Sequence, residues 1–320
     1  MKTQPEFLNL RTHLQQFIVG QEVLIDRLLM GLLTGGHLLL EGPPGVAKTT
    51  AVKALASGVH AGFQRIQFTP DLMPADITGS DVFDPKSGDF RFIPGPIFHE
   101  IVLADEINRA PPKVQSALLE AMEEHQITVS STTHTLPELF FVMATQNPLE
   151  QSGTYALPEA QLDRFFMHVL VDYPTGEEEL KILQRDRKLH FGEDTGDISS
   201  PLKPDTVLQA RHETSEIHIE ATLEQYVVSL VQATRTLGNH VPEWSDIIEI
   251  GASPRATIAM LRAASANAYL HGRDYVNPDD ILDVAADILR HRIITTVNAE
   301  AKQITSDMII QRILEVIRIP

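Results

Sequence analysis

Short apolar runs of strand length recur through the first half of the chain. They lie at His37–Leu40, Arg65–Phe68, Ile101–Ala104, Phe140–Ala144 and Phe166–Val171. Runs of four to six residues that are continuously apolar, or that alternate apolar with polar positions, predict β-strands. The first half of the chain is therefore expected to contain a sheet of about five strands.

Helical patterns separate these strands. Lys48–His60 follows the first apolar run, and Pro112–His125 places Val114, Leu118 and Met122 on one face with acidic residues on the opposite face. Apolar positions three to four residues apart predict an amphipathic helix, and a proline suits its first turn. Strands that alternate with helices predict a mainly parallel sheet covered on both faces.

The pattern changes after residue 175. A polar stretch at 194–204 interrupts a series of helical patterns that contain few strand-like runs. We therefore predict an α/β domain over 1–175 and a helical domain over 176–320. The helices expected in the second domain are Glu177–His190, Leu223–Leu237, Ser253–Ala268, Pro278–His291 and Asp307–Ile317.

The composition narrows the class of protein. The chain has 320 residues, 43% of them hydrophobic and 22% charged, with no cysteine and a net charge of −17. Without cysteine, disulfides, zinc–thiolate sites and cysteine nucleophiles are excluded. The sequence has no secretory signal pattern and no apolar run of roughly 18 residues, so we expect a cytoplasmic location and no membrane segment. The acidic balance disfavours nucleic acid as the main partner, because phosphate binding needs a basic face.

The segment EGPPGVAKTT, from Glu41 to Thr50, has the pattern of a phosphate-binding loop between a strand and a helix. Backbone N–H groups in such a loop face the phosphates; Lys48 is expected to reach the β- and γ-phosphates and Thr49 to coordinate Mg²⁺. Gly42 and Gly45 are expected to supply positive φ or close approach to phosphate, and Ala47 is expected at negative φ. The alternative is a glycine-rich turn with a chance lysine. The expected nucleotide-binding residues are Gly42, Pro43, Pro44, Gly45, Val46, Ala47, Lys48, Thr49 and Thr50.

Three further polar residues end apolar strands. IVLADE ends with Asp105 and Glu106, and FVMATQNP contains Asn147 immediately before its final proline. Asp105 is expected to bind ATP-associated Mg²⁺ through water, Glu106 to polarise the attacking water, and Asn147 to orient that water without adding charge. An acid pair or an Asn-Pro at the end of a strand is otherwise an ordinary loop signal.

Two arginines lie far along the chain from the loop. Arg164 in LPEAQLDRF suits a finger that reaches the γ-phosphate of a neighbouring subunit, and its alternative is a salt bridge to Asp163 or Glu159. Arg255 in GASPRA suits a sensor of the γ-phosphate on a moving lid. Its alternative is an exposed arginine at a helix start.

Together, and in this order, these motifs resemble the AAA+ ATPases and, more narrowly, the MoxR family. The resemblance covers nearly the whole chain, and the alanine before the lysine of the loop is common in that family. The segments that carry it are IVGQE (18–22), EGPPGVAKT (41–49), FTPDLMPADITG (68–79), GPIFHEIVLADEINRAPPKVQSALLEAMEE (95–124), ATQNP (144–148), LPEAQLDRF (157–165), VDYP (171–174), GASPRA (251–256) and LRHRI (289–293).

The resemblance implies a P-loop core with a parallel five-stranded sheet, a C-terminal helical lid, and a ring, usually a hexamer, with ATP between subunits. It implies that Val19, Gly20 and Gln21 lie near the adenine, and it leaves open whether Arg255 acts on its own nucleotide or on a neighbour's. Arg109, in the NRA signature, is a candidate contact to the neighbouring subunit.

Two insertions are expected from the same resemblance and from turn signals. Residues 79–96 and 126–138 each read as a β-hairpin, the first of them interrupting the second helix of the core. In related ATPases such hairpins face the pore or the client. The alternative is a surface hairpin with no further role.

The first functional hypothesis is a Mg²⁺-dependent ATP hydrolase that remodels client proteins as a chaperone. The resemblance adds a partner with a von Willebrand factor type A (VWA) domain and a role in activating enzyme complexes, sometimes with metal insertion. A nucleic-acid motor is the second hypothesis, disfavoured because only Lys86 and Arg91 are basic in the two hairpins. A scaffold that binds ATP without turnover is the third.

Overall fold

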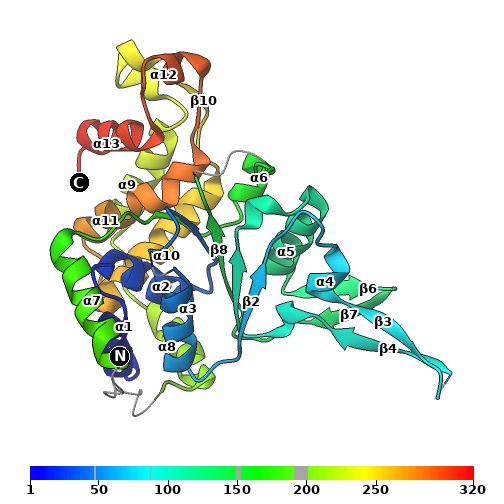
Figure 1. Ribbon diagram of the computed structural model, residues 1–320. Helices are drawn as coiled ribbons and strands as arrows, with labels where there is room; N and C mark the ends of the chain where they lie inside the picture. The colour runs from blue at the N-terminus through cyan, green and yellow to red at the C-terminus, as the bar shows by residue number, and fades with distance from the viewer. Residues whose placement is uncertain (47, 87, 149–152, 191–200) are drawn as a thin grey trace.

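A five-stranded parallel sheet forms the centre of the protein in a computed structural model that describes residues 1–46, 48–86, 88–148, 153–190 and 201–320 (Figure 1). The strand order is β2-β5-β8-β1-β9, and every neighbouring pair is parallel. All five strands predicted from the sequence are confirmed. Their bounds are β1 (Leu38–Glu41), β2 (Phe63–Gln67), β5 (Ile101–Asp105), β8 (Phe141–Gln146) and β9 (Met167–Leu170).

Alternate side chains of the strands point to two separate hydrophobic clusters. In β1, Leu38 and Leu40 belong to one cluster and Leu39 to the other. All three are fully buried, as is typical of a parallel sheet covered on both faces. The sheet therefore separates a layer formed by the N-terminal helices from a layer formed by α5 (Figure 1).

The helices of this half are α1 (Gln4–Phe17), α2 (Glu22–Thr34), α3 (Lys48–Gly58), α4 (Pro74–Thr78), α5 (Pro112–Glu124) and α6 (Glu159–Leu162). The predicted helices after the loop and after Pro111 are confirmed as α3 and α5. Helices α1 and α2 were not predicted. Helix α2 buries residues on all its sides, so it lacks the polar face that makes a helix visible as a periodic pattern.

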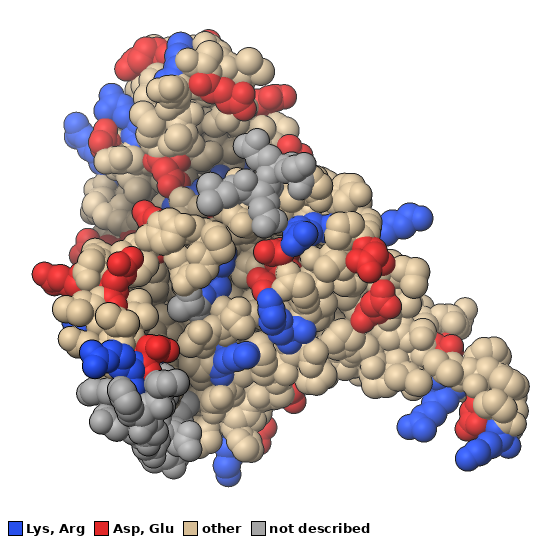
Figure 2. Space-filling view, in the orientation of Figure 1, with Lys and Arg blue, Asp and Glu red and all other residues tan. Residues whose placement is uncertain are grey.

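Two antiparallel hairpins extend from the α5 side of the sheet (Figure 1). Phe92 of the longer hairpin stacks on His134 of the shorter one at 3.7 Å between ring centroids. Phe83 and Phe90 form an edge-to-face pair nearer the tip of the longer hairpin and are 51% and 72% exposed. Figure 2 shows this hairpin projecting from the body, with charged side chains toward its tip. The strands are β3 (Gly79–Asp84), β4 (Asp89–Pro94), β6 (Gln126–Val129) and β7 (Thr132–Thr135).

The second half of the chain is mainly helical. Helix α8 was not predicted, because it buries only Val207, Ala210 and Thr214 and shows little periodicity. Residues 194–200 of the expected linker lie outside the described residues. Within the described ranges, no helix is both long and apolar enough to cross a membrane. The elements are α7 (Gly176–His190), α8 (Pro204–Ser215), α9 (Ala221–Ala233), β10 (Ile248–Ile250), α10 (Pro254–Leu270), α11 (Pro278–Leu289), β11 (Ile294–Thr295), α12 (Val297–Ala301) and α13 (Ser306–Val316).

Candidate active site

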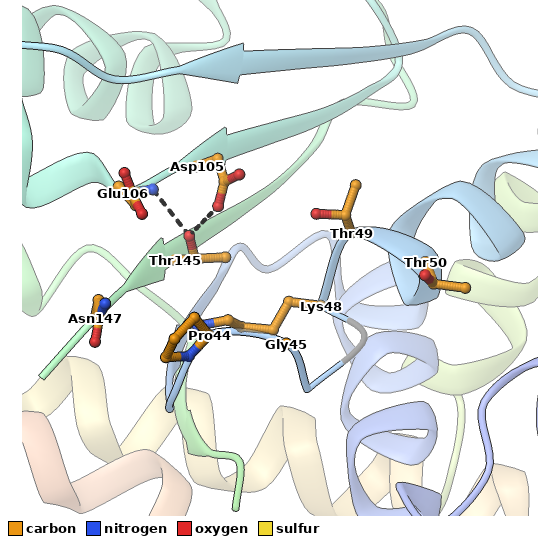
Figure 3. A pocket seen from close by; sticks show the side chains of 9 residues that line it. All are labelled: Pro44, Gly45, Lys48, Thr49, Thr50, Asp105, Glu106, Thr145 and Asn147. Carbon is orange, nitrogen blue, oxygen red and sulfur yellow. Dashed lines mark hydrogen bonds between the residues drawn. The ribbon is translucent and has the colours of Figure 1, made fainter. Parts of the chain in front are cut away.

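A cavity of about 350 Å³ opens beyond the carboxyl ends of β1, β5 and β8 (Figure 3). Ligands of open parallel sheets bind at this edge, where the loops that follow the strands converge. The cavity brings together the glycine-rich loop and the polar residues that were predicted after β5 and β8. Its lining residues are Pro44, Gly45, Lys48, Thr49, Thr50, Asp105, Glu106, Thr145 and Asn147.

The two glycines of the loop serve different purposes. Gly45 has φ +87°, a backbone conformation that a side chain would strain. Gly42 does not have a positive φ. It is required for another reason: a Cβ built there would lie 2.3 Å from the carbonyl oxygen of Val171. The expected close approach at Gly42 is thus to the protein's own backbone after β9. Ala47, with its predicted negative φ, lies outside the described residues.

Lys48 is the only basic side chain among the residues that line the cavity. Its Nζ donates a hydrogen bond of 2.8 Å to the carbonyl oxygen of Gly42, inside the loop. Burial lowers the pKa of Lys48, and the nearby carboxylates of Asp105, Glu106 and Glu41 oppose that shift. Lys48 is the first residue of α3. At this helix N-terminus, backbone N–H groups also favour a bound anion.

Asp105 is held from both sides at the end of β5. Thr145 of β8 donates to its Oδ1 at 2.7 Å. Arg65 of β2 donates to its Oδ2 through Nε at 3.0 Å and through Nη2 at 2.7 Å. The two neighbouring strands thereby fix the carboxylate, and Figure 3 shows Thr145 between Asp105 and Glu106.

Glu106 has an unusual backbone. Its φ of +57° is in the left-handed region, and its N–H donates to the Thr145 hydroxyl at 2.9 Å. Such strain in a residue other than glycine is often found at functional sites. The Oε2 atom of Glu106 accepts hydrogen bonds from Gln67 at 2.8 Å and from Arg109 at 3.0 Å. Asn147, which is 9% exposed, lines the same cavity.

Arg164 lies at the opposite edge of the sheet from this cavity. Two residues after it, Phe166 donates its N–H to the carbonyl oxygen of His37, just before β1. The loop begins after β1, whose four residues span roughly 13 Å at about 3.3 Å per residue. Arg164 pairs with Glu123 at 3.0 Å, rather than with Asp163 or Glu159.

Arg255 lies beside Arg164. It pairs with the same carboxylate, Glu123, near the end of α5. This end of α5 is at the amino edge of the sheet, because Met122 accepts a hydrogen bond from His37. Asp163, next to Arg164, instead pairs with Arg292 at 2.7 Å. Both predicted arginines are therefore grouped together and are remote from the cavity of their own chain.

Comparison with known proteins decides the family. Residues 37–167 match the family model of the ATPase family associated with various cellular activities (AAA), and residues 245–313 match that of the AAA lid domain. The chain is 44% identical to Chaperone MoxR1 of Mycobacterium tuberculosis over 96% of this chain and 80% of that protein. The chain belongs to the MoxR family of AAA+ ATPases.

Two further comparisons agree with the MoxR assignment. Protein MoxR of Methylorubrum extorquens is 31% identical over 86% of this chain and 84% of its own length. A crystal structure of a candidate ATPase from Cytophaga hutchinsonii superposes with a TM-score of 0.92 at 44% identity, covering all of this chain and 96% of that one. The P-loop fold with a helical C-terminal region, and the ATPase class predicted from the sequence, are confirmed.

In this MoxR-family chain, the residues expected near the adenine form a turn between α1 and α2. Gly20 has φ +75°, and a Cβ there would meet the carboxylate of Glu178 on α7. The side chain of Gln21 donates to the carbonyl oxygen of Asp172 at 3.1 Å. The turn of Val19, Gly20 and Gln21 thus contacts the segment after β9 and is not among the residues that line the cavity.

Four residues that organise these sites were not predicted from the sequence. Arg65 and Gln67 are two residues apart on β2, so their side chains lie on the same face of the strand. Because β2 pairs with β5, Arg65 reaches Asp105 and Gln67 reaches Glu106. Two polar residues at alternate positions of a predicted strand were the sequence signal that could have identified them. Thr145 lies inside the ATQNP motif and was passed over for Asn147. Nothing in the local sequence marks Glu123 as the partner of two distant arginines.

Proposed function

We propose that this MoxR-family ATPase hydrolyses ATP at sites completed by a second copy of the chain. The observation that carries the proposal is the separation of Arg164 from the cavity that holds Lys48 and Glu106. A single chain supplies the loop, the acids and the amide at one edge of its sheet, and the arginines at the other edge.

The cavity suits a nucleotide with Mg²⁺. The Thr49 hydroxyl and the Asp105 carboxylate are oxygen donors, and Mg²⁺ is commonly held by one or two protein groups together with phosphates and water. Figure 3 shows the Thr49 hydroxyl directed toward the Asp105 side of the cavity. Held by Thr49 directly and by Asp105 through water, Mg²⁺ would supply positive charge beside the phosphates. The loop N–H groups and Lys48 would hold the phosphates themselves.

Glu106 and Asn147 are proposed to prepare the attacking water. Glu106 would accept a hydrogen bond from the water and increase its nucleophilicity, while Asn147 would orient it toward the γ-phosphorus. Gln67 and Arg109 hold the Glu106 carboxylate through one oxygen atom, Oε2. They are positioning residues, because they act through Glu106.

A ring supplies the missing cation. In a closed ring with head-to-tail contacts, one surface of each subunit meets a different surface of the next. We propose that the amino edge of one sheet faces the carboxyl edge of the neighbouring sheet, so that Arg164 reaches the neighbour's γ-phosphate. Arg255 lies beside Arg164, which favours action on the neighbour's nucleotide as well. A hexamer is the assembly that the family resemblance suggests.

The biological role proposed is that of a chaperone in the cytoplasm. Its support is the 44% identity to a relative named Chaperone MoxR1. The exposed Phe83 and Phe90 offer an apolar contact surface for a client, whereas Lys86 and Arg91 remain the only basic residues of the projecting hairpin. A VWA-domain partner and a role in metal insertion complete the proposal on the basis of the family resemblance.

The experiment that tests this function measures ATP hydrolysis per subunit against protein concentration, with particle mass determined alongside. We expect the wild-type rate to rise as the mass increases, and Glu106→Gln to assemble and bind ATP but lose turnover by about 10²–10⁴-fold. A rate per subunit that is independent of concentration and mass would contradict completion by a second copy. Tight ATP binding with no turnover at any concentration would favour the scaffold.

A further inference from the structure

A second cavity, of about 400 Å³, lies between α2, α8 and α10. It shares no lining residue with the nucleotide cavity. Its volume is within the range of small-molecule sites, roughly 300–1,000 Å³. Aliphatic side chains, among them Leu33 and Leu261, form one part of the wall, and hydroxyl groups and two arginines form another. The cavity therefore offers an apolar surface and a cationic one to the same ligand.

Arg211, on α8, is largely buried with little to balance its charge. Its Nε donates 2.7 Å to the carbonyl oxygen of Leu32, near the C-terminus of α2, and its guanidinium packs beside Gly35. Its Nη2 is buried without a hydrogen-bond partner among the described residues. Burial lowers the pKa of Arg211, and only Glu138 opposes the shift. Capping α2 thus uses the Nε donor of this side chain and leaves the Nη2 donors unpaired among the described residues.

Two other polar groups of the cavity are also available, whereas the hydroxyls of Thr34, Thr214 and Ser215 already donate to backbone carbonyls of their own helices. Within the described chain, Arg262 of α10 is exposed and takes part in no ion pair or hydrogen bond. Ser265, one helical turn further on, is 7% exposed, and its hydroxyl has no hydrogen-bond partner in the described part of the chain. Among the described residues, neither Arg211 nor Arg262 forms an ion pair, although the net charge of the protein is −17. They create a local site for an anion.

We propose that this second cavity binds a small organic phosphate monoester. Two arginines match the charge of a phosphate monoester, about −1.5 to −2 at pH 7, and a guanidinium group binds two phosphate oxygens at once. The Ser265 hydroxyl adds a donor, and the aliphatic wall accepts an apolar ester group. The nucleotide site is not part of this proposal.

A ligand in this cavity would contact both halves of the chain. Helix α2 leads through Gly35 and Gly36 to β1 and the phosphate-binding loop, whereas α8 and α10 belong to the helical half. Binding would hold α2 against α8 and α10, which already pack on it.

Phenyl phosphate is the probe, and isothermal titration calorimetry of the full chain is the measurement. Saturating ADP fills the nucleotide site, so the titration reads the second cavity and its outcome does not depend on ATP turnover. We expect Arg262→Glu and Arg211→Gln each to weaken binding by at least about tenfold, because each removes a charged hydrogen-bond donor. Arg312→Glu, at a partly exposed arginine on α13, is the control and should leave the affinity unchanged.

Arg262 is exposed, so Arg262→Glu keeps the fold testable even if Arg211→Gln disturbs the end of α2. Unchanged affinity in Arg262→Glu, or no binding at about 10 mM probe, would overturn the proposal. Benzoate, which has a similar ring but one negative charge, should bind at least about tenfold more weakly. Equal affinity for benzoate would overturn the assignment to a phosphate monoester.

Discussion

The two edges of the central sheet differ in the chemistry that they present. At the carboxyl edge, Asp105, Glu106 and Asn147 surround a cavity whose single lining cation is Lys48. At the amino edge, Arg164 and Arg255 share the carboxylate of Glu123 on a partly exposed surface. The first edge has the types of group that suit nucleotide binding and activation of water. The second has the cations that, in our proposal, stabilise the charge of a phosphoryl-transfer transition state.

Under the proposed mechanism, one site is divided between two surfaces of the same fold. Lys48 at the carboxyl edge and a neighbour's Arg164 at the amino edge would stabilise the γ-phosphate from two sides. Because the strands keep the two edges apart, the proposal makes rapid hydrolysis depend on assembly.

The largest effect is expected when the amino edge loses its finger. Arg164→Ala should lower kcat by about 10³–10⁵-fold and leave ATP binding intact, since Arg164 is remote from the cavity of its own chain. Steady-state kinetics and nucleotide titration measure the two quantities. Arg312→Ala, on α13, is the control. Normal hydrolysis by Arg164→Ala would remove the difference between the edges on which the proposal rests.

A second large effect is expected where the helical half is attached to the amino edge. Arg292 is 7% exposed, and it pairs with Asp163 and donates to the carbonyl oxygen of Phe165 at 2.7 Å. Arg292→Ala should lower the free energy of unfolding by about 3–5 kcal/mol, because it leaves buried acceptors unpaired. Urea unfolding measures this free energy, with Arg312→Ala as the control. A loss below about 1 kcal/mol would show that this attachment contributes no more than a surface ion pair.

The pH dependence of stability tests the burial of a neutral histidine, His37, at the amino edge. His37 is buried there in its neutral form: its Nδ1 accepts from the N–H of Val142, so its Nε2 donates to Met122. Burial lowers the pKa of His37 to about 3. The unfolded chain, with a pKa near 6.5, binds the proton first, so this contribution to stability is full above about pH 6.5 and is lost toward pH 3.

Replacing His37 should therefore make the free energy of unfolding depend less on pH. Between about pH 6 and 4, His37→Gln should reduce the slope of unfolding free energy against pH by about 1.4 kcal/mol per pH unit. His218→Gln changes an exposed histidine and should leave the slope unchanged. Denaturant unfolding at several pH values gives both slopes. An unchanged slope in His37→Gln would mean that His37 is not held neutral in the folded protein.

The smallest effect is expected from releasing the two arginines. Glu123→Gln removes a carboxylate from pairs that are about one-third to one-half exposed, so stability should change by less than about 1 kcal/mol. Hydrolysis at low protein concentration should rise by up to about fivefold, because the arginines no longer have to break their ion pairs with Glu123 before they bind a phosphate. Glu124→Gln, the adjacent exposed acid, is the control for both assays. A lower rate in Glu123→Gln would show that Glu123 positions the arginines instead of competing for them.

The two edges also differ in how far the sequence predicts them. Lys48 ends the loop after β1, Asp105 is the last residue of β5, and Asn147 directly follows β8. Parallel strands bring such residues to one edge. Their grouping in one cavity was therefore accessible from local patterns. The same patterns miss Arg65 and Gln67, whose effect depends on β2 lying next to β5.

The amino edge depends on contacts between residues far apart in the chain. Arg255 meets Glu123 across 132 positions, and Arg292 meets Asp163 across 129. No periodicity or spacing records such pairs, so Arg164 was given the wrong alternative partners. Gly42 shows the same limit, because the backbone that excludes its side chain belongs to Val171.

The most direct test of the divided site mixes two inactive variants. Lys48→Ala keeps the arginines and loses phosphate binding, whereas Arg164→Ala keeps the cavity and loses the finger. In randomly mixed rings at equal amounts, about a quarter of the interfaces join an intact cavity to an intact finger. We predict that the mixture hydrolyses ATP at about that fraction of the wild-type rate, well above either variant alone. A mixture no more active than its two components, despite proven co-assembly, would contradict completion of the site by a neighbouring Arg164.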